Sequence, residues 1–115
     1  MIRAASVEND EGEERLLEEQ LARYGHDRNV ETTCVHYGSA EAFLDASYDV
    51  DVVFMDIDLP GMNGMDAAAQ MRRCDATTQI VFVTSLAQYA VKGYEVDAAG
   101  FIVKPVRFYD MAMCL

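Results

Sequence analysis

Charged and hydroxyl-bearing side chains stand where several short apolar segments of this 115-residue sequence end. Asp56 and Asp58 directly follow one such segment, and the other segments end at Glu8-Asn9-Asp10, at Thr84-Ser85 and at Lys104. Oxygen ligands without histidine or thiolate favour Mg²⁺, and a carboxylate can act as a nucleophile toward a phosphoryl group. A lysine and a hydroxyl beside that carboxylate would bind phosphoryl oxygens, so these residue types allow phosphoryl transfer onto an aspartate.

These side chains can act together only if the fold brings the segment ends to one place. Apolar segments alternate with helical patterns along the chain, which predicts a parallel sheet with right-handed crossovers and helices on both faces. The carboxyl ends of parallel strands meet at one edge, so the polar residues should converge there. We expect strands at 2–7, 30–36, 50–55, 80–84 and 101–103, and helices at 13–24, 40–46, 64–73 and 87–96, with Ser39 as an N-cap.

Each of these residues also has a purely structural interpretation. Asp58 could belong only to the turn at Pro60-Gly61, Asp56 could only cap a strand, and Lys104 could be a solvated strand end. Their joint occurrence at the ends of several strands favours a shared site, because separate structural roles would not require convergence.

Composition limits the compartments and partners of the protein. The formal net charge is −11, and a surface this acidic repels phosphate backbones, so we expect no direct nucleic-acid binding. We assign most of the glutamates in helix 13–24 to a solvated face opposite Leu17 and Leu21. No apolar run suits a membrane span or a signal peptide, and the three cysteines fit neither a disulfide framework nor a zinc site. We therefore expect one cytoplasmic domain over residues 1–115.

Three motifs carry a family resemblance. DIDLPGMNG, VFVTS and IVKPV, at their separations in this sequence, resemble the receiver domain of two-component response regulators over essentially the whole chain. The stretch LAQYAVKGYEVDAAGFIVKPV is further similar to receivers of LytTR-type transcriptional regulators, where a DNA-binding domain would follow. The resemblance implies a flavodoxin-like fold with strand order 2-1-3-4-5. A fifth helix is also expected, but the segment VRFYDMAMCL allows only one or two turns before Leu115, which indicates either a fragment lacking an effector domain or a short natural receiver.

The resemblance also implies a phospho-acceptor and a metal site. Asp56 would take a phosphoryl group from a phosphohistidine of a sensor histidine kinase. Asp56 and the backbone carbonyl of Asp58 would ligate Mg²⁺, and Glu8 would commonly act through a metal-bound water. The second acid of the family pattern is Asn9 here, so the pocket loses one negative charge and we expect weaker Mg²⁺ binding. Asp10 could compensate only if its loop shifted.

The resemblance also implies roles for residues at the ends of the other strands. The Thr84 hydroxyl and the Lys104 ammonium would hold phosphoryl oxygens. Phe101 matches the family's aromatic switch position, and Pro105 would follow a cis peptide bond.

The segment 87–96 suggests an output surface. Its main apolar stripe should face the sheet, which leaves Tyr89 and Val96 seven residues apart on the opposite side. We interpret these two residues as a partner surface, with a homodimer through the face formed by this helix and the fifth strand.

The function we expect is a Mg²⁺-dependent signalling switch and not an enzyme, and the family resemblance implies that it controls transcription. One alternative is a pseudo-receiver that works without phosphate as an interaction module, because Asn9 has disabled the pocket. A second is a phosphatase with Asp56 as nucleophile and Asp58 as general acid, although a chain this small lacks an obvious cap or substrate pocket.

Overall fold

The computed structural model describes all of residues 1–115. Five parallel strands form one sheet in the order β2-β1-β3-β4-β5, which confirms the predicted topology. The strands are β1 (Ile2–Val7), β2 (Thr32–Tyr37), β3 (Val52–Met55), β4 (Gln79–Thr84) and β5 (Gly100–Val103). Their bounds differ from the expected ones by no more than two residues at either end.

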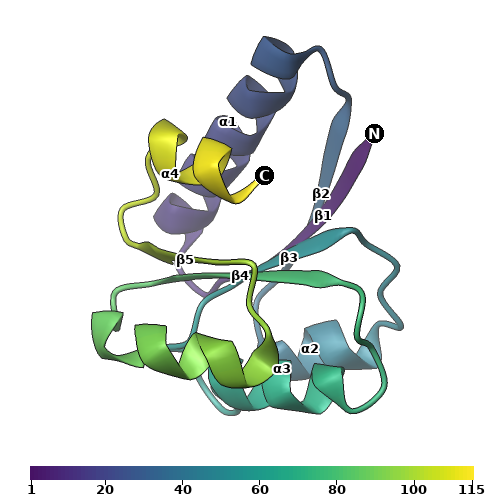
Figure 1. The fold of residues 1–115 in the computed structure, drawn as a ribbon, viewed down its shortest axis with the longest axis vertical. Coiled ribbons are helices and arrows are strands. Elements are labelled where there is room, and N and C mark those ends of the chain that lie inside the picture. The colour runs from purple at the N-terminus through teal and green to yellow at the C-terminus, as the bar shows by residue number, and fades with distance from the viewer.

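Helices cover both faces of the sheet (Figure 1). The helix α1 (Glu11–Arg28) and the short α4 (Phe108–Cys114) lie on one face. The other face carries α2 (Ala40–Asp45), α3 (Gly64–Arg72) and the segment η1 (Ala87–Val96). None of these helices combines the length and the apolar character that crossing a membrane requires.

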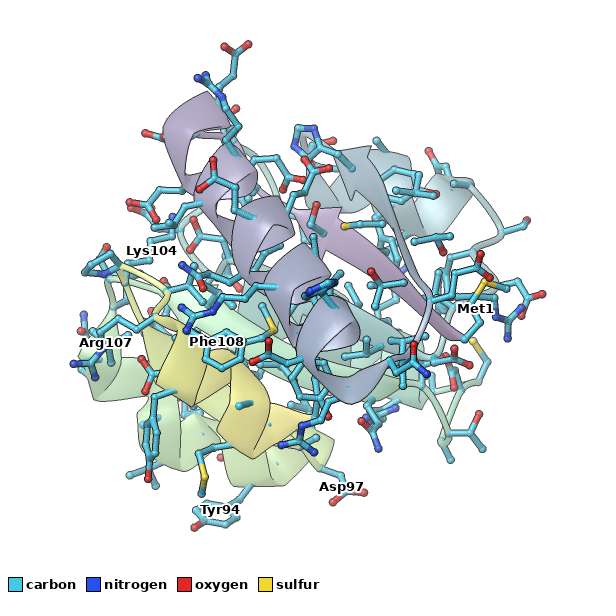
Figure 2. All side chains as sticks on the ribbon, turned by 90° about the horizontal axis from the view of Figure 1, so that it is seen from above. Met1, Tyr94, Asp97, Lys104, Arg107 and Phe108 are labelled. Carbon is cyan, nitrogen blue, oxygen red and sulfur yellow. The ribbon has the colours of Figure 1, made fainter.

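The sheet separates two apolar cores, and β3 contributes to both. All four β3 residues are buried, with Val53 and Met55 in one core and Val52 and Phe54 in the other. This division follows from the period of two along a strand, and it explains why the β3 sequence is continuously apolar. The short α4 closes the second core with Met111, and its Phe108 ring lies 4.0 Å from the Arg23 guanidinium of α1 (Figure 2).

Side-chain caps begin three of the helices. Asp10, Ser39 and Asn63 accept hydrogen bonds from the backbone of α1, α2 and α3, respectively, which confirms Ser39 as an N-cap. The helix α1 is longer than expected at both ends, because Asp10 caps it at Glu11 and it continues to Asn29, which adopts the left-handed conformation.

The segment η1 has the expected bounds, but the prediction of its exposed face was wrong. It is wound as a 3₁₀ helix, Val96 is only 4% exposed, and Tyr89 packs against the core beneath the sheet. Tyr94 is 88% exposed and projects away from the ribbon, and Val91 is 76% exposed (Figure 2). Arg72 of α3 donates to the carbonyl oxygen of Val96 at 2.7 Å, and this contact directs the end of η1 inward.

A buried carboxyl lies between α1 and the sheet, in a helix whose glutamates we expected to be mostly solvated. Glu14 is 5% exposed, and it accepts a hydrogen bond from the Ser6 hydroxyl of β1. His36 Nε2 of β2 lies 4.0 Å from it. Burial raises the pKa of Glu14 from 4.5 to about 7, and neighbouring Glu18 adds to this increase, whereas Ser6 and His36 oppose it.

Glu14 should give the protein a pH-dependent stability. The native state keeps the Glu14 proton up to about pH 7, whereas the unfolded chain loses it near pH 4.5. The free energy of unfolding should therefore fall by about 2–4 kcal/mol as the pH rises between these values, and then level off. Glu14→Gln should remove this slope in urea unfolding measured from pH 4.5 to 8. The exposed Glu19→Gln is the matched control, and equal slopes in the two variants would contradict the assignment.

Candidate functional site

The strand pairings continue one residue beyond the carboxyl edge of the sheet and position the candidate residues. The backbone amide of Asp56 donates to the carbonyl oxygen of Val7, and that of Lys104 donates to Thr84, both at 3.0 Å. The amide of Glu8 donates in the same way to Tyr37 of β2. The sheet ladder therefore fixes the backbone of Glu8, Asp56 and Lys104 relative to one another, as the strand-end argument predicts.

One ammonium group joins two buried carboxylates at this edge. Lys104 Nζ lies 2.8 Å from Glu8 Oε1 and 2.9 Å from Asp56 Oδ2. Glu8 and Asp56 are 6% and 4% exposed. Burial raises the pKa of Glu8, although its hydrogen bond from Lys104 opposes this. Burial alone would lower the pKa of Lys104, but Glu8 and Asp56 raise it above its ordinary value, so the lysine remains charged.

The loop after β3 holds the other oxygen of the Asp56 carboxylate. The backbone amide of Asp58 donates to Asp56 Oδ1 at 3.1 Å, and the Asp58 side chain is exposed. At Gly64, which begins α3, a Cβ atom would collide with the carbonyl oxygen of Asp56, so only glycine permits this close approach. The loop itself is tied to α2, because Glu41 accepts a hydrogen bond from the amide of Met62 at 3.0 Å.

The loop after β1 separates its three polar residues. Glu8 Oε2 accepts a hydrogen bond from the amide of Asp10 at 3.1 Å, whereas the Asp10 side chain caps α1 through the amide of Glu13. Asp10 is therefore committed to the helix and does not replace the missing acid. Asn9 is exposed. His36 Nε2 lies 2.8 Å from the carbonyl oxygen of Glu8, which ties this loop to β2.

Thr84 and Phe101 lie near the site without contacting its charged cluster. The Thr84 side chain is fully buried, and its Oγ1 accepts a hydrogen bond from the amide of Leu86 at 3.3 Å. Phe101 is partly buried, with its ring centroid 6.0 Å from that of Phe82. The peptide bond between Lys104 and Pro105 is cis, as the family resemblance implies.

Sequence reasoning missed Glu13, which lies beside this cluster. Its Oε2 atom is buried and has no hydrogen-bond partner, and its side chain lines a cavity of about 10 Å³ together with Glu8 and Asp56. Leu17 lines the same cavity. The signal was present in the sequence, because residues four apart share a helix face and Leu17 was predicted to be buried.

The side chains that meet at Asp56 offer carboxylate oxygens as metal ligands, together with one ammonium group. No three Asp, Glu, His or Cys side chains lie close enough together to chelate a metal ion by themselves. Two carboxylates and a nearby backbone carbonyl nevertheless fit Mg²⁺, which keeps several waters and shares phosphate oxygens with a substrate. This set of ligands is therefore compatible with a hydrated magnesium ion beside a phosphoryl group.

Comparison with known proteins agrees with this geometry. The family model of the response regulator receiver domain matches residues 5–114 of the sequence. The positive alginate biosynthesis regulatory protein of Pseudomonas aeruginosa is 33% identical over 108 residues, which cover 90% of this chain and 43% of that protein. The sensory transduction protein LytT of Bacillus subtilis is 35% identical over 107 residues, which cover 91% and 43%. The chain thus spans less than half the length of these relatives.

Solved structures share the fold. The response regulator protein TrrA from Thermotoga maritima, in complex with Mg²⁺-BeF, superimposes with a TM-score of 0.82 at 24% identity, covering 96% of this chain and 93% of that one. The response regulatory domain of protein mrkE from Klebsiella pneumoniae gives 0.85 at 21%, covering 98% and 92%. The match over nearly the whole sequence and the two regulators above 30% identity show that this chain belongs to the response regulator receiver domain family of two-component signalling, with relatives of the LytTR type.

Proposed function

We propose that this chain is a phospho-acceptor switch of the cytoplasm. A carboxylate oxygen of Asp56 attacks the phosphorus atom of a phosphohistidine on a sensor histidine kinase. The phosphorus–oxygen bond forms, the phosphorus–nitrogen bond breaks, and the histidine nitrogen leaves with its electron pair. The observation that carries the proposal is the 2.9 Å contact between Lys104 Nζ and Asp56 Oδ2, because a cation beside the nucleophile is where phosphoryl charge must be balanced.

Residues around Asp56 have distinct roles in this proposal. The Asp58 amide holds Asp56 Oδ1 and so orients the carboxylate. The Lys104 ammonium, which already contacts Asp56 Oδ2, binds an oxygen of the arriving phosphoryl group. Thr84 ends β4, which lies between β3 and β5 in the sheet. Its hydroxyl donates to a second oxygen of the phosphoryl group. Phe101 then turns inward as Thr84 moves, which carries the change toward η1.

Magnesium would be held by Glu8 through water, by Asp56 and the carbonyl of Asp58, and by the amide oxygen of Asn9. When bound, the ion would supply positive charge for the phosphoryl oxygens. The need for it follows from the charge of the site, since one ammonium faces two carboxylates before any phosphate arrives. The Mg²⁺-BeF complex of the Thermotoga maritima regulator supports the same assignment by analogy.

Phosphorylation can be detected directly as an increase in the mass of the intact chain. Incubation with acetyl phosphate and Mg²⁺ should add a single phosphate to the intact chain, and the adduct should be absent from Asp56→Asn and after removal of Mg²⁺ by EDTA. Asp58→Asn is the matched control, because it alters a nearby exposed carboxylate and leaves the backbone carbonyl in place. An adduct that persists in Asp56→Asn would contradict the assignment of the acceptor.

The same experiment decides between this proposal and the pseudo-receiver. One observation favours the alternative, because Asn9 contributes no charge to the pocket. Absence of any adduct at every Mg²⁺ concentration would establish it. The phosphatase alternative gains no support, because the cavity next to Asp56 has a volume of only about 10 Å³.

We further propose that the output surface is a homodimer interface on the outer side of η1 and β5. Exposed Val91 and Tyr94 line a shallow apolar groove of about 530 Å³, together with Gly93, Ala98 and Phe101. Phe101 belongs to both the groove and the proposed switch, so its movement would reshape this surface. In a longer regulator resembling the two relatives, dimerisation of this kind would control an attached output domain, with transcription as the output.

Charged side chains introduced into the apolar groove should weaken self-association. Val91→Lys combined with Tyr94→Glu should shift sedimentation velocity profiles at high protein concentration toward the monomer, while the mass adduct at Asp56 still forms. Val35→Lys, an exposed apolar position on β2 at the far edge of the sheet, is the matched control. Identical profiles for the double variant and the unmodified chain would contradict the interface.

A further inference from the structure

Glu13 has a buried carboxylate oxygen that nothing in the fold satisfies. Its backbone amide is used to begin α1, where it donates to Asp10 Oδ1 at 3.0 Å. Its side chain passes inward on the face of Leu17, and Oε2 has no hydrogen-bond partner. An unpartnered buried carboxylate oxygen costs stability, so its retention beside the proposed phospho-acceptor site calls for a compensating interaction.

The cavity at Glu13 is shared with the residues of that site. Glu8 and Asp56 line it from the ends of β1 and β3, and its remaining walls are mostly apolar side chains such as Leu17 and Phe54. Its volume of about 10 Å³ is close to what one water molecule occupies. A water there could connect the Glu13 carboxylate to the other two, although the three do not form a chelating cluster on their own.

The charge around this cavity is unbalanced. Lys104 is the ammonium in contact with Glu8 and Asp56, and Glu13 makes no ion pair. Glu8, Asp56 and Glu13 therefore bring three negative charges to one cavity beside a single cation, which contacts only Glu8 and Asp56. The excess of two negative charges suits a divalent ion. Apolar walls screen charge poorly, so the Glu13 carboxylate should be felt at Asp56 more strongly than a carboxylate on the surface would be.

The residue at position 9 explains why the excess negative charge around the cavity matters. The family pattern has an acid there, whereas this chain has Asn9, which is exposed and uncharged. We propose that Glu13, acting across the shared cavity, supplies the negative charge that position 9 lacks and thereby sets the Mg²⁺ affinity of the site. The inference rests on the proposed function. Glu13 is a positioning residue, because it acts on the ion through its field and a bridging water.

The test is a Mg²⁺ titration at constant ionic strength, followed by the amide NMR signals of Asp56 and Asp58. A site-specific signal is necessary because a chain of net charge −11 binds magnesium over its whole surface. Glu13→Gln, which keeps the side-chain shape, should weaken the fitted affinity about three- to tenfold. Glu11→Gln removes the same charge from an exposed position in the same helical turn, so it should change the affinity by less than about twofold.

Rescue separates a charge role from a packing role. Asn9→Asp combined with Glu13→Gln restores the net charge and should return the affinity to within about twofold of the unmodified chain. Glu13→Asp keeps the charge on a shorter side chain and should retain more affinity than Glu13→Gln. Equal effects of Glu13→Gln and Glu11→Gln, or no rescue by Asn9→Asp, would overturn the inference while leaving the phosphate adduct intact. Absence of saturable Mg²⁺ binding in the unmodified chain would overturn it together with the metal dependence of the proposed function.

Discussion

The contact of the Lys104 ammonium with Glu8 and Asp56 is the interaction on which the site depends. Two carboxylates with little access to water repel each other, and without a cation both could not remain ionised at neutral pH. Lys104 relieves this repulsion at 2.8 and 2.9 Å. The same contact limits the chemistry, because a phosphoryl group that arrives at Asp56 must take over Lys104 as its own counter-ion. The resting structure is thus already arranged for the charge that the proposed function would bring.

The strand order explains why a lysine fills this role. Asp56 and Glu8 follow neighbouring strands, β3 and β1, whereas Lys104 follows β5, which is separated from β3 by β4. Two strand spacings amount to about 9–10 Å, a span that the long lysine side chain and the Asp56 side chain cover together. Thr84 ends the intervening strand, so its backbone lies between those of Asp56 and Lys104, although its hydroxyl does not contact the charged cluster. The geometry of the site is therefore a consequence of topology, and the loops adjust it.

Much of this arrangement could be predicted from sequence because it rests on patterns of short range. The continuous apolar run of β3 indicated a strand buried on both faces, and the polar residues at the strand ends indicated a shared edge. The face of η1 could not be predicted, because both of its sides are apolar. Arg72 of α3 donates to the carbonyl oxygen of buried Val96, and such a long-range contact leaves no local signal. Most glutamates of the first helix were assigned to a solvated face, because glutamates are usually exposed. Glu13 and Glu14 nevertheless lie four and three residues from buried Leu17.

The central claim is that Lys104 is the counter-ion of the resting pocket, and the free energy of unfolding of Lys104→Met in urea at pH 7 tests it most directly. The account predicts a loss of about 2–4 kcal/mol relative to the unmodified chain, because Glu8 and Asp56 would be left buried without a cation. Lys92→Met, at an exposed position, provides the comparison. A loss no larger than that of Lys92→Met would contradict the account, since the carboxylates would then tolerate each other without the lysine.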